Sequence, residues 1–115
     1  MKSQNSFDHP EALDVNEVIG IIRFRWGVTY DLQLVQRQKR IYLQMMWGYL
    51  EQQSFPLDEK DFKERLNKVI EVVNRIGQAD LVRKWLSTIQ QKPMLGRALT
   101  LPLRSEEESL KEFLI

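Results

Sequence analysis

Residues 30–45 read YDLQLVQRQKRIYLQM, and this stretch decides the fold. Apolar and polar residues alternate on both sides of a polar break at residues 36–40. A period of two is typical of a β-strand with one buried face. Two such runs around a short break therefore predict a β-hairpin. The break holds no Asn-Gly or Asp-Gly pair, so the sequence leaves the type of turn open.

A helix is predicted N-terminal to the hairpin, over residues 15–26, because apolar residues recur there at helical spacing. Asp14 and Glu17 stand at the two positions of a capping box, in which each side chain bonds the other residue's backbone N–H. Gly27 can supply the left-handed residue on which such a helix ends.

A second helix is predicted to begin after Asp58 and to be closed by Gly77, with one apolar stripe along it. Its opposite face places acids four residues before bases, an arrangement that favours ion pairs along a helix. The expected pairs are Asp61–Arg65, Glu64–Lys68 and Glu71–Arg75. Between residues 45 and 54 both strand and helix spacings fit, so a short helix that ends before Pro56 stays open.

A further helix and a late strand complete the predicted elements. The helix is expected to end before Pro93 and to turn Leu81, Val82, Trp85, Leu86 and Ile89 inward. Residues 99–103 alternate around Pro102, which suits a strand at the edge of a sheet. The sum is an α+β fold: an N-terminal helix, a hairpin, two to three helices and a third strand. We expect a flexible arm over 1–13, one domain over 14–104, and a tail over 105–115 that is frayed or a short helix.

Composition excludes several classes of function. The chain has no cysteine and one histidine, which excludes disulfides, thiolate nucleophiles and multi-histidine metal sites. Its 17 basic and 16 acidic residues give no overall attraction to nucleic acid or membrane. Neither a membrane-spanning run nor a secretory signal is visible, so we expect a soluble, intracellular protein without cofactor or metal.

The sequence offers few residues of the types that catalysis requires. The single histidine, His9, falls in the expected arm, and no cluster of glycines precedes a helix. Asp31 and Glu51 lie among aromatic residues and remain candidates for acid–base chemistry. The alternative is that each carboxylate is a structural group paired with a nearby arginine, and we favour this reading.

Aromatic and basic residues gather in the same part of the chain. More than half of the aromatic residues fall between 26 and 55, where five bases also face a single acid between residues 21 and 50. Tyr42 alternates with Ile41 and Leu43, so either helices cover both faces of the sheet or one aromatic face is open to a partner. Phe55 is read either as a hydrophobic staple onto the next helix, near Phe62, or as an anchor for a partner.

These patterns give a candidate interaction surface within residues 37–55. Its members are Arg37, Lys39, Arg40, Tyr42, Trp47, Tyr49, Glu51, Gln52, Gln53 and Phe55. The leading hypothesis is a non-enzymatic module that binds an unknown protein partner through this surface. The alternatives are a nucleic-acid or anion binder that uses the basic tip of the hairpin, and a small acid–base enzyme.

Four segments resemble the domain-of-unknown-function family numbered 3067, which occurs in cyanobacteria and in plastids of plants and algae. They are Trp26-Gly27, Tyr30-Asp31-Leu32-Gln33-Leu34, MWGYLEQQSFPL at residues 46–57, and Leu95-Gly96-Arg97-Ala98. The resemblance spans roughly residues 15–104 and leaves the arm and the tail outside. It implies an α+β domain of unusual topology and transfers no catalytic residue.

The resemblance also implies a setting. It points to the cytoplasm of a cyanobacterium, or to the plastid stroma for plant relatives. Residues 1–13 contain acids and no arginine, unlike a transit peptide, which favours the cyanobacterial setting. A distribution in oxygenic phototrophs further implies an assembly or regulatory factor linked to photosynthesis.

Overall fold

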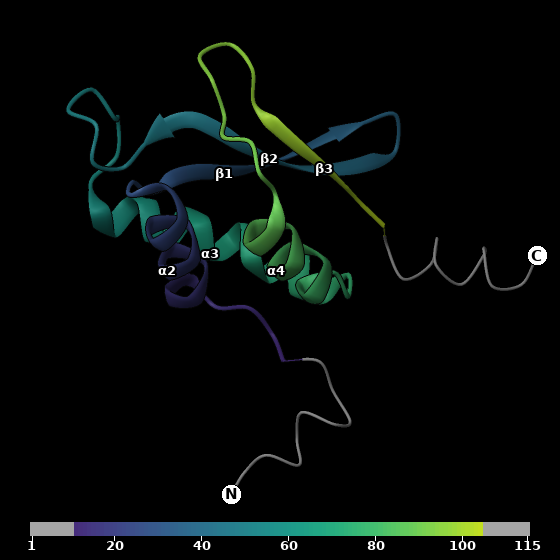
Figure 1. Cartoon of the computed structure of the whole chain (residues 1–115). Helices are drawn as coiled ribbons and strands as arrows, with labels where there is room; N and C mark the ends of the chain where they lie inside the picture. Colours follow the sequence, from purple (N-terminus) through teal and green to yellow (C-terminus); the bar gives the residue numbers. More distant parts are fainter. Residues whose placement is uncertain (1–10, 105–115) are drawn as a thin grey trace, which may run out of the picture.

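The computed structural model describes residues 11–104, so most of the expected arm and all of the expected tail lie outside the described residues. Along the chain the elements are α2 (Val15–Trp26), β1 (Tyr30–Arg37), β2 (Arg40–Tyr49), α3 (Glu59–Arg75), α4 (Ala79–Thr88) and β3 (Leu99–Leu103) (Figure 1). The predicted α+β fold is confirmed. Strand β2 extends to Tyr49, and turns follow it up to residue 54. The short helix that the sequence left open in this segment therefore does not form.

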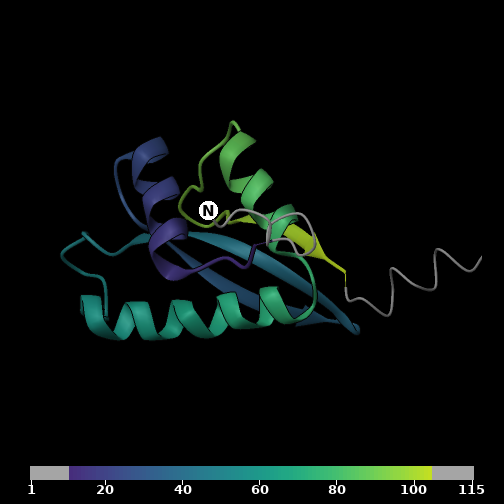
Figure 2. The same cartoon turned by 90° about the horizontal axis from the view of Figure 1, so that it is seen from below.

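The three strands form one antiparallel sheet in the order β1-β2-β3, so β3 is an edge strand, as predicted. Helices α2, α3 and α4 lie on one side of this sheet (Figures 1 and 2). Helix α3 packs against β1, and α2 packs against both α3 and α4. Leu32, Leu43 and Leu103, which turn toward the helices, are buried. The core therefore lies between one face of the sheet and the helical layer.

Helix α2 begins and ends where the sequence predicts. The Asp14 carboxylate accepts the Glu17 N–H at 2.8 Å, and Gly27, with φ 79°, donates its N–H to the Arg23 carbonyl at 2.8 Å. The second half of the capping box is different from the prediction, because the Glu17 carboxylate binds Arg83 Nε at 2.6 Å. A charged donor forms a stronger hydrogen bond to a carboxylate than a backbone N–H does.

Helix α3 buries the predicted apolar stripe and is capped by Asp58, whose carboxylate accepts the Asp61 N–H at 2.8 Å. The three ion pairs expected along its outer face do not form within the described residues. Arg65 instead binds the Asp31 carboxylate of β1 at 2.6 Å. Exposed pairs along a helix contribute only about 0.2–0.5 kcal/mol, so a buried carboxylate is the preferred partner.

Helix α4 turns most of its predicted residues inward. Val82 and Leu86 are buried, and Trp85 and Ile89 are half-buried. Leu81, which was expected inward, is 39% exposed. Val82 and Leu86 are four residues apart and occupy the buried stripe, and Leu81 lies at its margin.

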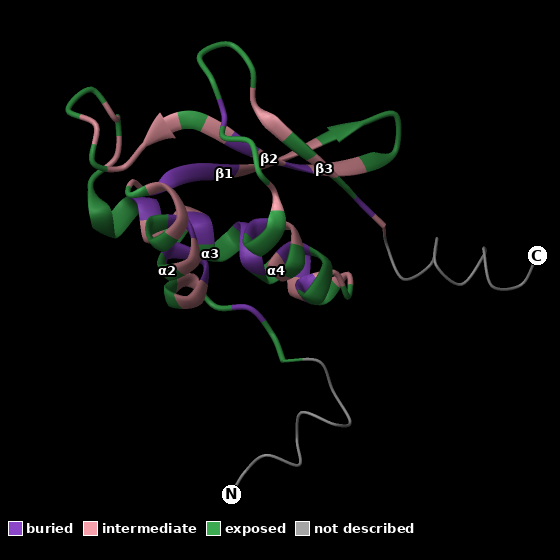
Figure 3. Cartoon of the chain, viewed as in Figure 1, coloured by how far each residue is buried: buried purple, intermediate pink, exposed green. Residues whose placement is uncertain are grey.

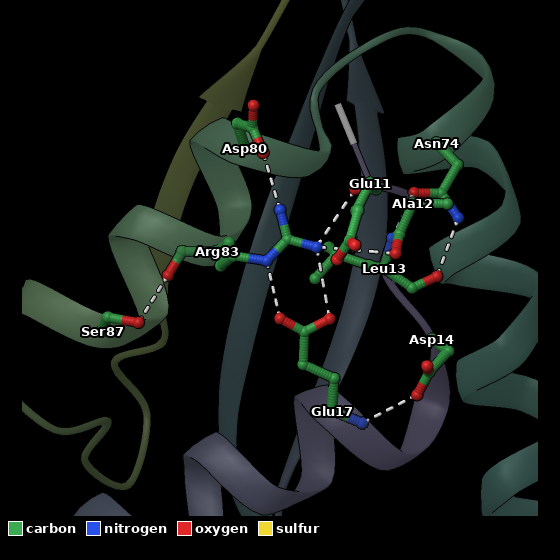
Figure 4. A network of polar contacts seen from close by, with 9 residues as sticks. All are labelled: Glu11, Ala12, Leu13, Asp14, Glu17, Asn74, Asp80, Arg83 and Ser87. Atoms are coloured by element: carbon green, nitrogen blue, oxygen red, sulfur yellow. Dashed lines mark hydrogen bonds and ion pairs between the residues drawn. The ribbon is translucent and has the colours of Figure 1, made fainter. Parts of the chain in front are cut away.

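Arg83 joins α4 to α2 and to the first described residues (Figure 4). Besides Glu17, its guanidinium donates to the Glu11 carbonyl at 3.1 Å. The hydrogen bond to Glu17 raises the pKa of Arg83, which keeps the guanidinium charged. Leu13 is 3% exposed and exchanges two hydrogen bonds, of 2.9 and 3.0 Å, with the Asn74 side chain. The end of the expected flexible arm is therefore fixed to the helices.

Candidate interaction surface

The hairpin turn consists of two residues, Gln38 and Lys39, between the paired residues Arg37 and Arg40. Gln38 has φ 51° and Lys39 has φ 70°, the left-handed values that a type I′ turn requires at both positions. Neither residue is glycine, so the turn carries backbone strain. All four side chains are exposed, and the turn lies at the far end of the hairpin (Figure 3).

Arg37 and Arg40 lie directly opposite each other on β1 and β2. Within residues 11–104, neither guanidinium makes an ion pair or a side-chain hydrogen bond. Like charges at paired positions of a hairpin destabilise it. As far as residues 11–104 are concerned, the two residues therefore form a positive patch with no acidic partner.

The face of the sheet that points away from the helices continues this patch. The next row across the three strands is Val35, Tyr42 and Pro102. These residues alternate with buried Leu43 and its neighbours, and no helix of the described chain lies over them (Figure 1). Of the two arrangements left open by the sequence, the one with helices on both faces of the sheet does not occur within residues 11–104. Tyr42 is half-buried.

The row beyond is polar. It contains Gln33, Gln44 and Thr100, and Gln44 Nε2 donates to Thr100 Oγ1 at 3.4 Å. We call the three rows together the open face. Its residues are Val35, Arg37, Arg40, Tyr42, Gln44, Thr100 and Pro102. Gln33, at the β1 end of the polar row, is left out because its amide donates to Asp31 beside α3.

The other aromatic residues of the predicted surface are tied to the core to different degrees. Tyr49 packs edge-on against Tyr30, with ring centroids 6.1 Å apart. Phe55 packs against Phe62 at 5.8 Å, which is the contact that the staple interpretation requires. Trp47 is 38% exposed. The predicted surface therefore divides into the open face and a separate region around the loop after β2.

Glu51 serves as the anchor of that loop. Its carboxylate accepts the Thr29 N–H at 2.8 Å and the Thr29 hydroxyl at 2.7 Å, and it pairs with Arg23 Nε at 3.2 Å. Burial raises the pKa of Glu51, but the hydrogen bonds from Thr29 and the Arg23 charge outweigh it and leave the pKa below its ordinary value. Of the two glutamines that follow, Gln52 is half-buried and Gln53 is exposed.

The two candidate acid–base groups are held by different arginines. Asp31 is 4% exposed and binds Arg65 at 2.6 Å and Gln33 at 2.9 Å, whereas Glu51 binds Arg23. These are the contacts of structural ion pairs. In the described part of the chain, no three acidic or histidine side chains lie close enough together to hold a metal ion.

Phe24 and Gly20 are not among the residues that the sequence pattern indicates. Phe24 is 91% exposed on α2, and Gly20 lies one helical turn before it. Two sequence signals could have identified them: Phe24 is an aromatic residue outside the apolar stripe of its helix, and Gly20 is a glycine in the middle of that helix.

Comparison with known proteins gives two matches. A family model described as "Domain of unknown function (DUF3067)" matches residues 16–114, so the similarity extends beyond residue 104 into the segment that was expected to lie outside it. The solution NMR structure of the Alr2454 protein from Nostoc sp. strain PCC 7120, a structural genomics target, is 34% identical with a TM-score of 0.78. The match covers 90% of this chain and 98% of that one. No curated protein matches the sequence. Within residues 11–104, none of the helices combines the length and apolarity that crossing a membrane requires.

Proposed function

The chain belongs to the DUF3067 family of domains of unknown function, and from that premise we propose that it is a non-enzymatic protein-interaction module. Its ligand is an acidic segment of a partner protein, and its binding site is the open face. Family membership brings no activity with it, so the proposal depends on the chemistry of that face.

The observation that carries the proposal is the pairing of Arg37 with Arg40. Two like charges at opposite positions of a hairpin, with no acid bound to either in the described chain, lower the stability of the hairpin. Lys39 adds a third charge on a strained turn. Carboxylates of a partner compensate these charges, and the exposed patch accelerates association electrostatically.

The next row of the open face favours a protein over a nucleic acid. Val35, Tyr42 and Pro102 offer apolar area next to the arginines, as at the core of a protein interface with a charged rim. Nucleic-acid binding gains its affinity from many phosphate contacts, and this tip offers three bases in a chain with a net charge of +1. An acidic protein segment with apolar side chains therefore fits better.

The setting that we propose is the cytoplasm of a cyanobacterium, or the plastid stroma for plant relatives. The cyanobacterial origin of the similar Nostoc protein supports the first of these. In that setting the module would act as an assembly or regulatory factor for the photosynthetic apparatus.

The test uses a synthetic acidic peptide of alternating Glu and Val, titrated into isotope-labelled protein and followed by NMR. We expect the largest amide shifts along Arg37–Tyr42. The double variant Arg37→Gln/Arg40→Gln should weaken binding at least tenfold. The double variant Lys84→Gln/Lys92→Gln removes the same charge from exposed positions elsewhere and should bind as the unmodified protein does.

Two results contradict the proposal. The first is equal weakening by both double variants, which would show attraction to overall charge alone. The second is tighter binding of a single-stranded oligonucleotide than of the peptide, with a steeper loss at rising salt, which would support the nucleic-acid alternative. Tyr42→Ser separates the apolar from the charged contribution, since it should weaken the peptide complex with little change in its salt dependence.

A further inference from the structure

Phe24 is an apolar side chain that no other residue of the described chain, 11–104, covers. It lies on α2 and is 91% exposed, more than any other large hydrophobic residue that the structure describes. Helix α2 sits at the margin of the helical layer, with α3 and α4 against its inner side (Figure 2). An exposed phenylalanine on a rigid helix is a ready anchor for an interface.

Gly20 lies one turn before Phe24, on the same face of α2. A glycine in the interior of a helix destabilises it relative to alanine. A Cβ atom added at Gly20 would meet no atom within 4 Å, so packing within the described chain gives no reason for the missing side chain. The steric reason for a glycine at this place must therefore lie outside the described chain, and close approach by another molecule is such a reason.

A hollow of about 510 Å³ opens over Gly20. Ile21 and Phe24 of α2 and Ser87 of α4 are among the residues that line it. Pockets of about 300–1,000 Å³ hold drug-sized molecules, so this volume is enough for a phenylalanine side chain.

The charged groups at the rim of the hollow already have partners. Glu17 pairs with Arg83 at 2.6 Å. Arg25 donates to the Leu86 carbonyl at 2.8 Å and lies over the Trp26 ring at 4.6 Å. Both groups therefore keep a hydrogen-bond partner when this face is buried, and Glu17 is also ion-paired.

We propose that the chain associates with a second copy of itself through α2, with Phe24 of each copy seated in the hollow over Gly20 of the other. Phe24 forms one wall of the hollow, and Gly20 lies a single turn before it on the same helix. A two-fold axis between them sets two α2 helices antiparallel, and both contacts then form at once. A glycine at the crossing lets the two helices approach closely, because it carries no side chain.

The interface is small, because it uses little more than one face of one helix. It falls at the low end of interface size, which is typical of weak, reversible association. We expect a dissociation constant on the order of 100 μM. The contact lies on the helical side of the molecule and leaves the open face of the sheet free. The dimer proposal therefore does not depend on the proposed function, and each can fail without the other.

The test measures sedimentation velocity from about 0.02 to 1 mM, a range that brackets the expected dissociation constant. The unmodified chain should shift from monomer to dimer. Phe24→Ser should remain monomeric with an unchanged thermal midpoint. Leu95→Ser, a matched control at a residue 77% exposed on a loop, should dimerise normally.

Gly20→Ala gives a signature that a merely structural role of Gly20 would not produce. The alanine should raise the thermal midpoint, because it favours the helix, and should weaken dimerisation at least fivefold, because its methyl group enters the hollow. A gain in stability with unchanged or stronger association would overturn the proposal. A monomer throughout the concentration range would also overturn it, as would a Phe24→Ser variant that still dimerises.

The absence of cysteine from the chain provides a second readout. Ile21→Cys places one thiol close to the proposed two-fold axis, so mild oxidation should cross-link two copies rapidly. Lys92→Cys, on the loop after α4, should cross-link only at the rate of random collision. Equal rates for the two variants would contradict the proposed geometry.

Discussion

Asp31 of β1 and Arg65 of α3 form the ion pair that ties the sheet to the longest helix. Asp31 is 4% exposed. Its carboxylate accepts a hydrogen bond from the Arg65 guanidinium at 2.6 Å and another from the Gln33 amide at 2.9 Å. The pair joins residues 34 positions apart in the chain. A carboxylate buried to this degree depends on such partners, because water cannot replace them.

Arg65→Leu should lower the free energy of unfolding by about 1.5–3 kcal/mol, since it leaves the buried carboxylate with Gln33 as its remaining partner. Urea denaturation followed by circular dichroism measures the change. Lys68→Leu removes an exposed base one turn further along α3 and should cost less than about 0.5 kcal/mol. Equal losses in the two variants would mean that the Asp31–Arg65 pair is not a stabilising contact.

Glu51 should make stability depend on pH in the acidic range. Its folded-state pKa lies below the ordinary value of 4.5, because the Thr29 hydrogen bonds and Arg23 outweigh burial. The stabilisation is therefore fully present above pH 4.5 and is lost as the pH falls through the folded-state pKa. Glu51→Gln should be less stable than the unmodified protein at pH 7, and the difference should shrink toward pH 3. A difference independent of pH would refute this linkage.

Lys39→Gly should stabilise the hairpin by roughly 0.5–1 kcal/mol. Glycine adopts a left-handed φ without the cost that a side chain adds, and this gain exceeds the extra freedom of glycine in the unfolded chain. Thermal unfolding gives the comparison. Lys39→Ala removes the same charge and keeps the strained φ of 70°, so its midpoint should stay near that of the unmodified protein. If alanine stabilised the chain as much as glycine does, charge rather than strain would be the cause.

Arg83→Lys should lower stability by about 1–2 kcal/mol even though it keeps the positive charge. The guanidinium binds Glu17, Asp80 and the Glu11 carbonyl at once, and an ammonium group cannot reproduce that planar fork. Hydrogen exchange of the Leu13 amide should also become faster, because Arg83 helps to hold the segment before α2. Lys84→Met, at the exposed neighbouring position, serves as the control and should change neither quantity.

The elements themselves could be predicted because their signals are local. The Asp14 and Asp58 caps and the left-handed Gly27 act within one or two turns of their own helix, and all three are present. The alternation around residues 36–40 likewise identified the hairpin. The turn type was not predictable from its residues, since Gln38 and Lys39 adopt conformations that glycine and asparagine favour.

The polar contacts were harder to predict because they join distant parts of the chain. Glu17 is bound by Arg83, 66 residues away, rather than by its capping partner. Arg65 pairs with the buried Asp31 rather than with Asp61, its predicted partner on the same helix. In both cases a local contact worth a few tenths of a kcal/mol yields to a charge-assisted bond that only the folded chain brings within reach.

The candidate site was predictable in part for the same reason. Exposure of Arg37, Lys39 and Arg40 follows from a hairpin tip, which is a local feature. Which face of the sheet stays open depends on where the helices pack, and the alternation of Tyr42 with Leu43 is the same in either arrangement. The exposure of Phe24 likewise depends on how α2 packs against its neighbours.

The position of Pro102 bears on whether molecules can pair with one another through the edge of the sheet. Strand β3 forms an edge of the sheet, and an edge strand with all its N–H groups is a template on which strands of other molecules can stack into aggregates. Proline removes one of those donors, so β3 pairs with β2 on one side and offers an interrupted ladder on the other. Growth of the sheet from molecule to molecule is thereby disfavoured at this edge.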